Sequence, residues 1–205
     1  VGGLQSFGDR YCCMDKIVMW LKIAVSCLPA MLIGLPLKAW LDKHFYNPTV
    51  VALMLLLYGA GFLFVARYNR SRKPRVNSIA ALRWSDALLI GVFQVLALIP
   101  GTSRSGATIL GGILIGTSRE VAAEYTFFLA VPVMFGASLL KIVKFGAISG
   151  TELGVLLVCM AVAFGVSILA IRFLMGYIRK HDFTAFGWYR IGLGLLVLLY
   201  FYVIR

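Results

Sequence analysis

A short polar segment at positions 100–108, PGTSRSGAT, limits the possible folds of this chain more than any other feature. It lies between two apolar runs, 87–99 and 109–115. Pro100 lacks a backbone donor and Gly101 tolerates unusual backbone angles, so the pair predicts the end of a helix. Arg104 would be costly at membrane depth, where an arginine marks a functional site or a buried ion pair by default. The segment therefore predicts a polar break that is buried in protein or borders a water-filled cavity.

The chemistry of this break favours a bound phosphate group. Gly106 and Ala107 are expected to open a new helix, whose first N–H groups attract anions. A guanidinium, several hydroxyls and a helix N-terminus together form a good phosphate cradle. The alternative is an ordinary loop between two short helices. Because the runs 87–99 and 107–116 are each too short to span about 30 Å comfortably, we favour a re-entrant helix hairpin over about 84–116.

The composition places the chain among polytopic membrane proteins. Of its 205 residues, 61% are hydrophobic and 14% are charged, whereas soluble domains average about 45–50% and about 25%. We expect an all-α fold and a single integral membrane domain over residues 1–205. The net charge of +12 raises nucleic acid as a partner, but the positive charges lie in loops between apolar runs. That distribution follows the positive-inside rule and favours membrane lipids, not nucleic acid, as partners.

Apolar runs predict five membrane spans besides the hairpin, at 17–40, 49–66, 121–143, 153–175 and 186–204. Pro29 and Pro36 predict a kink or a break in the first span, and Lys22 is expected to reach the near surface. Residues 1–15, 41–48 and 145–152 are expected to be loops or turns, and 117–120 (TSRE) resembles a capped helix start.

The basic loops 67–83 and 176–184 are expected to be cytoplasmic. On this topology 13 of the 20 Lys and Arg residues fall on one side and five on the other, with Arg190 counted among the loop charges of 172–190.

Few other residues offer chemistry. Glu124 is either an acid that complements its helix dipole or a carboxylate directed toward Arg104 or a metal. His44 and His181 lie in loops and are expected to be solvated. The four cysteines show no metal-ligand spacing or disulfide pattern, and we expect free thiols at Cys12, Cys13, Cys27 and Cys159. Gly112 and Gly116, four residues apart, fit close helix packing.

The polar segment closely resembles the signature of the undecaprenyl-diphosphate phosphatase (bacitracin-resistance) family of bacterial inner membranes. The similarity extends upstream through Gln94 and 96–98 (LAL). Downstream it continues through Ser118-Arg119 and 122–124 (AAE), and then through 128–132 (FLAVP). The number and spacing of the spans also fit, so the resemblance covers most of the chain.

The resemblance implies a multi-pass phosphatase of the bacterial inner membrane. Such an enzyme removes the terminal phosphate of undecaprenyl diphosphate, which recycles the lipid carrier for cell-wall synthesis and confers bacitracin resistance. It also implies two inverted repeats, each with a re-entrant segment, and Mg²⁺ or Ca²⁺ as cofactor, with ligands that this sequence does not identify. Arg104 and Ser103 would be catalytic, and the substrate-binding residues would be Gly101, Thr102, Ser105, Gly106 and Thr108.

Members of the family carry an earlier motif near the N-terminus: two glutamates four residues apart, then Pro, paired serines, a Gly and a His. This chain has no such stretch, and Gln94 and Leu98 stand where the earlier copy has its glutamates. We therefore expect the chain to be the second half of an inverted-repeat protein, with Val1 lying after the motif. The nucleophile and general base would come from the other half, so these residues alone are expected to be inactive.

Two other functions remain open at this stage. A lipid-phosphate transporter or flippase would also use broken helices near the membrane midplane. A non-catalytic membrane subunit would use Arg104 structurally. A monomer and a homodimer are both open.

Overall fold

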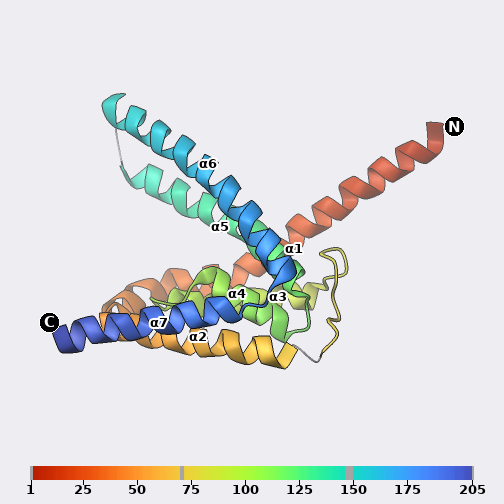
Figure 1. Ribbon diagram of the computed structural model, residues 1–205. Helices are drawn as coiled ribbons and strands as arrows, with labels where there is room; N and C mark the ends of the chain where they lie inside the picture. The colour runs from red at the N-terminus through yellow and green to blue at the C-terminus, as the bar shows by residue number, and fades with distance from the viewer. Residues whose placement is uncertain (1, 70–71, 146–149, 205) are drawn as a thin grey trace.

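The computed structural model describes residues 2–69, 72–145 and 150–204, and it confirms the all-α fold (Figure 1). A single isolated β-bridge joins Val76 and Thr117 in the described part of the chain. The elements are α1 (Gly2–Phe45), α2 (Pro48–Asn69), α3 (Trp84–Val95), the 3₁₀ helix η1 (Leu96–Leu98), α4 (Arg104–Leu114), α5 (Arg119–Phe145), α6 (Gly150–Lys180), α7 (Thr184–Leu199) and the π-helical turn η2 (Tyr200–Ile204).

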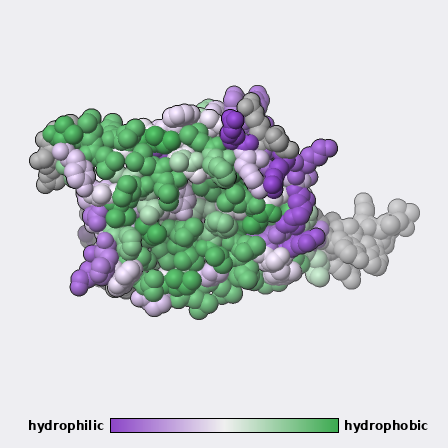
Figure 2. Space-filling view, turned by 90° about the horizontal axis from the view of Figure 1, so that it is seen from below, coloured by the Kyte–Doolittle hydropathy of each residue, from purple (hydrophilic) through white to green (hydrophobic). Residues whose placement is uncertain are grey.

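Five segments are long and apolar enough to cross a membrane, and they match the five predicted spans. They are Met14–Gly34, Pro48–Asn69, Arg119–Val143, Gly150–Lys180 and Thr184–Val203. A broad apolar surface lies between polar ends in Figure 2, as a bilayer requires. The chain is therefore a polytopic membrane protein.

Helix α1 differs from its prediction at both ends. Residues 2–15 and 41–45 are helical, so the expected loop at 1–15 and the expected turn at 41–48 are wrong over these residues. No proline precedes Pro29, so every backbone donor in the early segment is available for helical bonds. Pro29 and Pro36 lie inside one continuous helix, and Figure 1 shows that its course changes direction.

The turn that follows α1 is shorter than expected and is closed by a cap. The Asn47 Oδ1 atom accepts a hydrogen bond from the Val50 N–H at 2.8 Å, which satisfies an amide at the start of α2. Pro48 is the first residue of α2, where a missing N–H costs nothing.

Lys22 is buried, not at the surface as predicted. Its side chain is 7% exposed, and its Nζ atom lies 6.0 Å from the centroid of the Trp84 ring. The packing of α1 against α3 encloses it, and the indole face offers a favourable position for the ammonium group.

Helices α1 and α3 run side by side in the same direction. Lys22 lies near Trp84 at one end, and a Cβ atom on Gly34 would lie 3.1 Å from Leu98 at the other. Between them, a Cβ atom on Gly91 would lie 2.4 Å from the carbonyl oxygen of Ser26, so only glycine allows this approach. The Ser26 hydroxyl, which donates to Ala87 O at 2.6 Å, ties the two helices together.

Helices α2 and α7 cross at a pair of glycines. A Cβ atom on Gly187 would lie 2.9 Å from the carbonyl oxygen of Gly59, and one on Gly59 would lie 2.7 Å from Ile191. The two backbones therefore approach as closely as small-residue interfaces in membranes allow.

The basic loops meet at one end of the molecule. The Arg75 and Val76 amides donate to Gly116 O at 2.8 and 3.1 Å, and the Ser118 amide donates to Val76 O at 2.8 Å. The 72–83 loop is thereby joined to the α4–α5 turn. Ser118 also caps α5 by accepting from the Val121 N–H at 3.2 Å, as the sequence predicted. The cytoplasmic assignment of this end remains a prediction.

Replacing Gly187 by alanine is expected to destabilise the fold by about 1–3 kcal/mol, because the added methyl group overpacks the crossing with α2. Gly192→Ala is the matched control on the same helix, since nothing lies within 4 Å of a Cβ atom there. Unfolding of the purified protein in micelles measures both free energies. Equal stability of the two variants would show that the crossing does not depend on glycine.

Candidate functional site

The predicted polar break is a tight turn between two short helices. After η1, Ile99 is extended, and the Thr102 N–H donates to Ile99 O at 3.1 Å. Gly101 has a φ of +89°, and a Cβ atom there would lie 2.6 Å from the carbonyl oxygen of Val51. Both the backbone angle and the contact with α2 require glycine.

Helix α4 begins at Arg104, two residues before the predicted start at Gly106. The reason is Ser103, which has extended backbone angles and accepts a hydrogen bond from the Gly106 N–H at 3.2 Å. A serine N-cap of this kind satisfies one of the four free amides of a helix start. The amides of Arg104 and Ser105 have no intrahelical acceptor, so they are free for an anion.

The turn lies beside the span α2, not beyond it. Gly101 contacts Val51, three residues after the start of α2, and Gly106 lies against Phe62, seven residues before its end. The whole turn thus sits within the length of a helix that is apolar enough to cross a membrane.

The hydroxyls of the segment differ in how free they are. The Ser103 and Ser105 hydroxyls lie 3.0 Å apart, and Ser105 is exposed. Thr108 is 1% exposed; its hydroxyl points to Arg104 O and Ser105 O and accepts from the Thr126 hydroxyl at 3.0 Å. Thr102 is 8% exposed, and its Oγ1 atom lies beside the Tyr58 side chain without a partner in full hydrogen-bond geometry.

Gln94 is a further buried polar group on the approach to the turn. It is 3% exposed, and neither its Oε1 nor its Nε2 atom has a hydrogen-bond partner in the protein. Buried amides are almost always satisfied, so Gln94 and Thr102 mark a region whose polar groups need a partner.

Arg104 is half-buried at the first position of α4. The ion pairs among the described residues join Arg75 to Asp86, Arg119 to Asp182 and Arg179 to Glu120. Arg104 is in none of them. The titratable group that acts electrostatically on Arg104 is the buried Cys27 of α1, a thiol and not a carboxylate. The positive charge of Arg104 is thus left for an anion.

Sequence analysis missed a second guanidinium at this turn. Arg190 of α7 was counted as a loop charge, but its Nη2 atom would lie 3.2 Å from a Cβ atom on Gly106. The correction follows from the crossing at Gly187, which turns the next helical turn of α7 toward α4. The only signal in the sequence is that Arg190 lies four residues after the start of the predicted span 186–204.

The other candidate residues lie elsewhere. Glu124 is exposed on α5, and His44 and His181 are exposed, with His181 stacked on Tyr177 at 4.5 Å. Cys27 and Cys159 are free thiols as predicted, whereas the side chains of Cys12 and Cys13 lie outside the described ones. Gly112 packs against Ala122, which fits the predicted close contact, and Gly116 has a φ of +98° and ends α4.

The turn does not fit a divalent cation by itself. The described residues contain no group of three or more His, Cys, Asp or Glu side chains placed to hold a metal. Arginine and serine side chains surround the turn, and Mg²⁺ and Ca²⁺ prefer carboxylate and carbonyl oxygens. We therefore assign no cation ligand to these residues.

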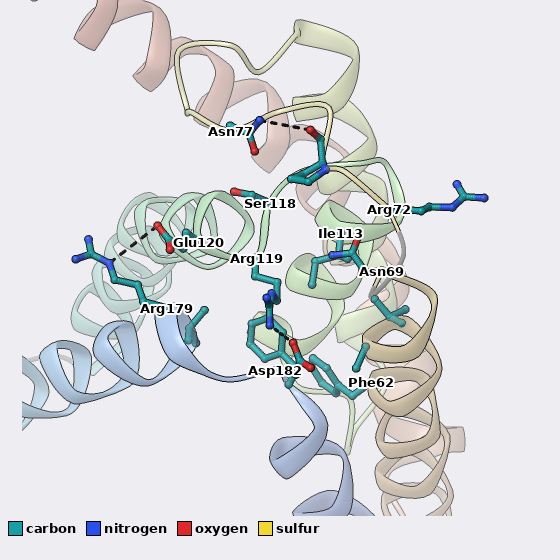
Figure 3. Close-up of a pocket in the computed structure, with 15 residues that line it drawn as sticks. Phe62, Asn69, Arg72, Asn77, Ile113, Ser118, Arg119, Glu120, Arg179 and Asp182 are labelled. Carbon is teal, nitrogen blue, oxygen red and sulfur yellow. Dashed lines mark hydrogen bonds and ion pairs between the residues drawn. The ribbon is translucent and has the colours of Figure 1, made fainter.

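A separate cavity of about 600 Å³ opens at the end where the basic loops meet (Figure 3). Its charged residues are largely paired with one another: Arg119 with Asp182, and Arg179 with Glu120 at 4.0 Å. The cavity borders Ile113, near the end of α4 opposite Arg104, and Phe62, whose ring also lies beside Gly106. Residues 100–108 of the turn are not among those that line it.

Comparison with known proteins identifies the family of this chain. The model of the family described as bacitracin resistance protein BacA matches residues 2–196. The chain belongs to the BacA family. The chain is 57% identical over 202 residues to a protein of Acetivibrio thermocellus named undecaprenyl-diphosphatase, covering 98% of this chain and 74% of the relative.

Two other BacA relatives show the same coverage pattern. The undecaprenyl-diphosphatase 1 of Clostridium acetobutylicum is 53% identical over 199 residues, which is 96% of this chain and 73% of the relative. The undecaprenyl-diphosphatase of Streptococcus mutans is 58% identical over 186 residues, which is 89% of this chain and 66% of the relative. The predicted family is thus confirmed.

Gly101→Ala is expected to disrupt the fold more than Gly116→Ala does. Both residues have a positive φ, which costs a side chain about 1–2 kcal/mol. Only Gly101 would also bring a Cβ atom within 3.0 Å of other backbone; at Gly116 the nearest atom is 3.5 Å away. The yield and unfolding midpoint of the two purified variants measure the difference, and a more stable Gly101→Ala variant would contradict the contact with Val51.

Proposed function

We propose that the turn at the start of α4 binds the diphosphate group of undecaprenyl diphosphate. Undecaprenyl-diphosphatase activity is the function of this chain's family and of relatives 53–58% identical to it. The observation that carries the assignment of the site is Arg104, a half-buried guanidinium at a helix start that is in none of the ion pairs among the described residues.

Each predicted residue has a role that its geometry supports. Arg104 clamps non-bridging phosphate oxygens and stabilises the charge that develops as the terminal phosphate leaves. Ser103 fixes the helix start as its N-cap, and Ser105 offers an exposed hydroxyl. Gly101 lets the turn approach Val51 of α2, and Gly106 leaves room for the Arg190 guanidinium beside the first turn of α4.

Thr102 and Thr108 support the proposal in different ways. Thr102 has a buried hydroxyl beside Tyr58 that lacks a well-formed hydrogen bond, and a phosphate oxygen would satisfy it. Thr108 already engages the backbone of α4 and Thr126, so it holds the first turn of the helix in place. Ligand contact by any of these residues stays a prediction.

We also propose that α3, η1 and α4 form a re-entrant hairpin. The α-helices have 12 and 11 residues, about 18 and 16 Å at 1.5 Å per residue. Neither crosses about 30 Å of hydrocarbon. The turn lies alongside α2 within its length, and two short helices meeting at a polar tip would place it at membrane depth.

The complete reaction needs groups that the turn does not supply. The turn has no carboxylate for activating water, so we propose that the nucleophile and base come from the other half of an inverted-repeat protein. These residues alone would then be inactive. A requirement for Mg²⁺ or Ca²⁺, a single domain over 1–205 and a homodimer remain predictions. Phosphate release from the full-length protein, compared with lipid translocation in vesicles, separates a phosphatase from a transporter.

Arg104→Lys in the full-length protein is expected to lower kcat by about 10²-fold or more, because an ammonium is a point charge without the planar fork of a guanidinium. Arg104→Ala is expected to lower it at least as much. Phosphate release from undecaprenyl diphosphate measures both. Arg172→Lys, at an exposed position on α6, is the matched control and should retain wild-type activity.

The same samples test a purely structural role for Arg104. We expect normal membrane abundance of the Arg104 variants, because removing a charge eases insertion. Low abundance with normal activity per folded molecule would favour the structural role. Near-wild-type turnover of Arg104→Lys would contradict the phosphate clamp.

Cysteine labelling tests the topology and the hairpin. In a variant without native cysteines, Ser78→Cys is expected to resist an impermeant thiol reagent in intact cells, because Ser78 lies in a basic loop.

Ser105→Cys is expected to react with a small water-soluble reagent, because Arg104 needs water around it. Labelling of Ser78→Cys from outside would overturn the orientation, and an inert Ser105→Cys would contradict a water-accessible tip.

A further inference from the structure

We propose that Arg190 is a second substrate-binding guanidinium, which recognises the diphosphate group and distinguishes it from a single phosphate. This inference rests on the proposed function of the turn. Its basis is the position of Arg190 beside Gly106, on a helix far from the signature segment in sequence.

The position of Arg190 is fixed by the crossing of α2 and α7. Gly187 lies in backbone contact with Gly59, and Arg190 follows Gly187 by three residues, on the same face of the helix. Three residues after Gly59 on α2 is Phe62, whose ring centroid lies 5.5 Å from the Arg190 Cζ atom. The guanidinium therefore lies over an aromatic face, a contact that holds the group in one place.

Arg190 is directed at the start of α4. Its Nη2 atom lies where it would be 3.2 Å from a Cβ atom on Gly106, and the Phe62 ring lies 3.4 Å from the same point. Glycine at position 106 thus leaves room for the guanidinium next to the free amides of the first turn.

The charge of Arg190 lacks an acidic partner. The Nη1 atom is buried and has no hydrogen-bond partner in the protein, and Arg190 takes no part in the ion pairs found in the described segments. Its electrostatic neighbour is the neutral phenol Tyr58 of α2. Leaving a buried donor of a cation unsatisfied is costly, which indicates that a ligand completes the site.

Two guanidinium groups and a helix start suit a ligand with two phosphate groups. Arg104 is the first residue of α4, and Arg190 lies beside Gly106, two residues further along the same turn, so each guanidinium is proposed to bind one phosphate. The monophosphate product offers fewer oxygens and less negative charge, and it would lose the contacts of one guanidinium. Arg190 would accordingly favour binding of the substrate over retention of the product.

The test compares Arg190→Gln, Arg190→Lys and the control Arg172→Gln in the full-length protein. Steady-state phosphate release gives kcat and KM, and inhibition by inorganic pyrophosphate and by inorganic phosphate gives the selectivity. Arg190→Gln is expected to raise both KM and the inhibition constant of pyrophosphate about tenfold or more, as loss of a charged hydrogen bond does. The inhibition constant of phosphate should change by less than about threefold. Arg190→Lys keeps the positive charge, so its KM and its inhibition constant for pyrophosphate should lie between those of the wild type and Arg190→Gln.

Each outcome decides between the possibilities. Unchanged KM and pyrophosphate inhibition in Arg190→Gln, or equal weakening of pyrophosphate and phosphate, would overturn the proposal while leaving the role of Arg104 intact. If the wild-type protein releases no phosphate, the proposed function itself fails. Where Arg190→Gln folds poorly, Arg190→Lys and Gly106→Ala decide. The alanine Cβ would lie 3.2 Å from Nη2 and shift the guanidinium away from the first turn of α4, which should weaken pyrophosphate binding more than phosphate binding.

Discussion

The structure depends on a positive charge placed in apolar surroundings without a carboxylate beside it. Most cations in the described parts of the chain either lie at the polar ends or are paired, as Arg119 is with Asp182. Arg104 and Arg190 are half-buried between helices and, like the buried Lys22, take no part in the ion pairs of the described residues. A charge there is stable only with water or an anion. The free amides at the start of α4 also favour an anion at this place.

Close packing at small residues determines where these charged side chains lie. Gly91 lets α3 approach α1, Gly101 lets the turn touch α2, and Gly59 with Gly187 lets α7 cross α2. Membrane helices lack a hydrophobic driving force toward one another, so close backbone contact supplies much of their association. The same contacts set the register that brings Arg190 to Gly106.

The sequence predicted the parts of this fold that depend on local chemistry. Apolar length identified the spans, the Pro-Gly pair located the turn, and the TSRE segment at 117–120 indicated the capped start of α5. It failed where tertiary contacts decide: the extension of α1 through residues 2–15, the burial of Lys22 beneath Trp84, and the orientation of Arg190. A local sequence pattern does not distinguish an arginine in a loop from an arginine inside a helix. Arg190 belongs to the second kind, because α7 turns it toward α4, a segment distant in sequence.

We propose that the first turn of α4, and not the cavity at the opposite end of that helix, holds the diphosphate. An experimental structure of the full-length protein with a non-hydrolysable diphosphate lipid distinguishes the two places. We expect phosphate oxygens within hydrogen-bond distance, about 3 Å, of the Arg104 guanidinium and the first amides of α4. A diphosphate bound instead among Arg72, Arg119 and Arg179 would contradict it.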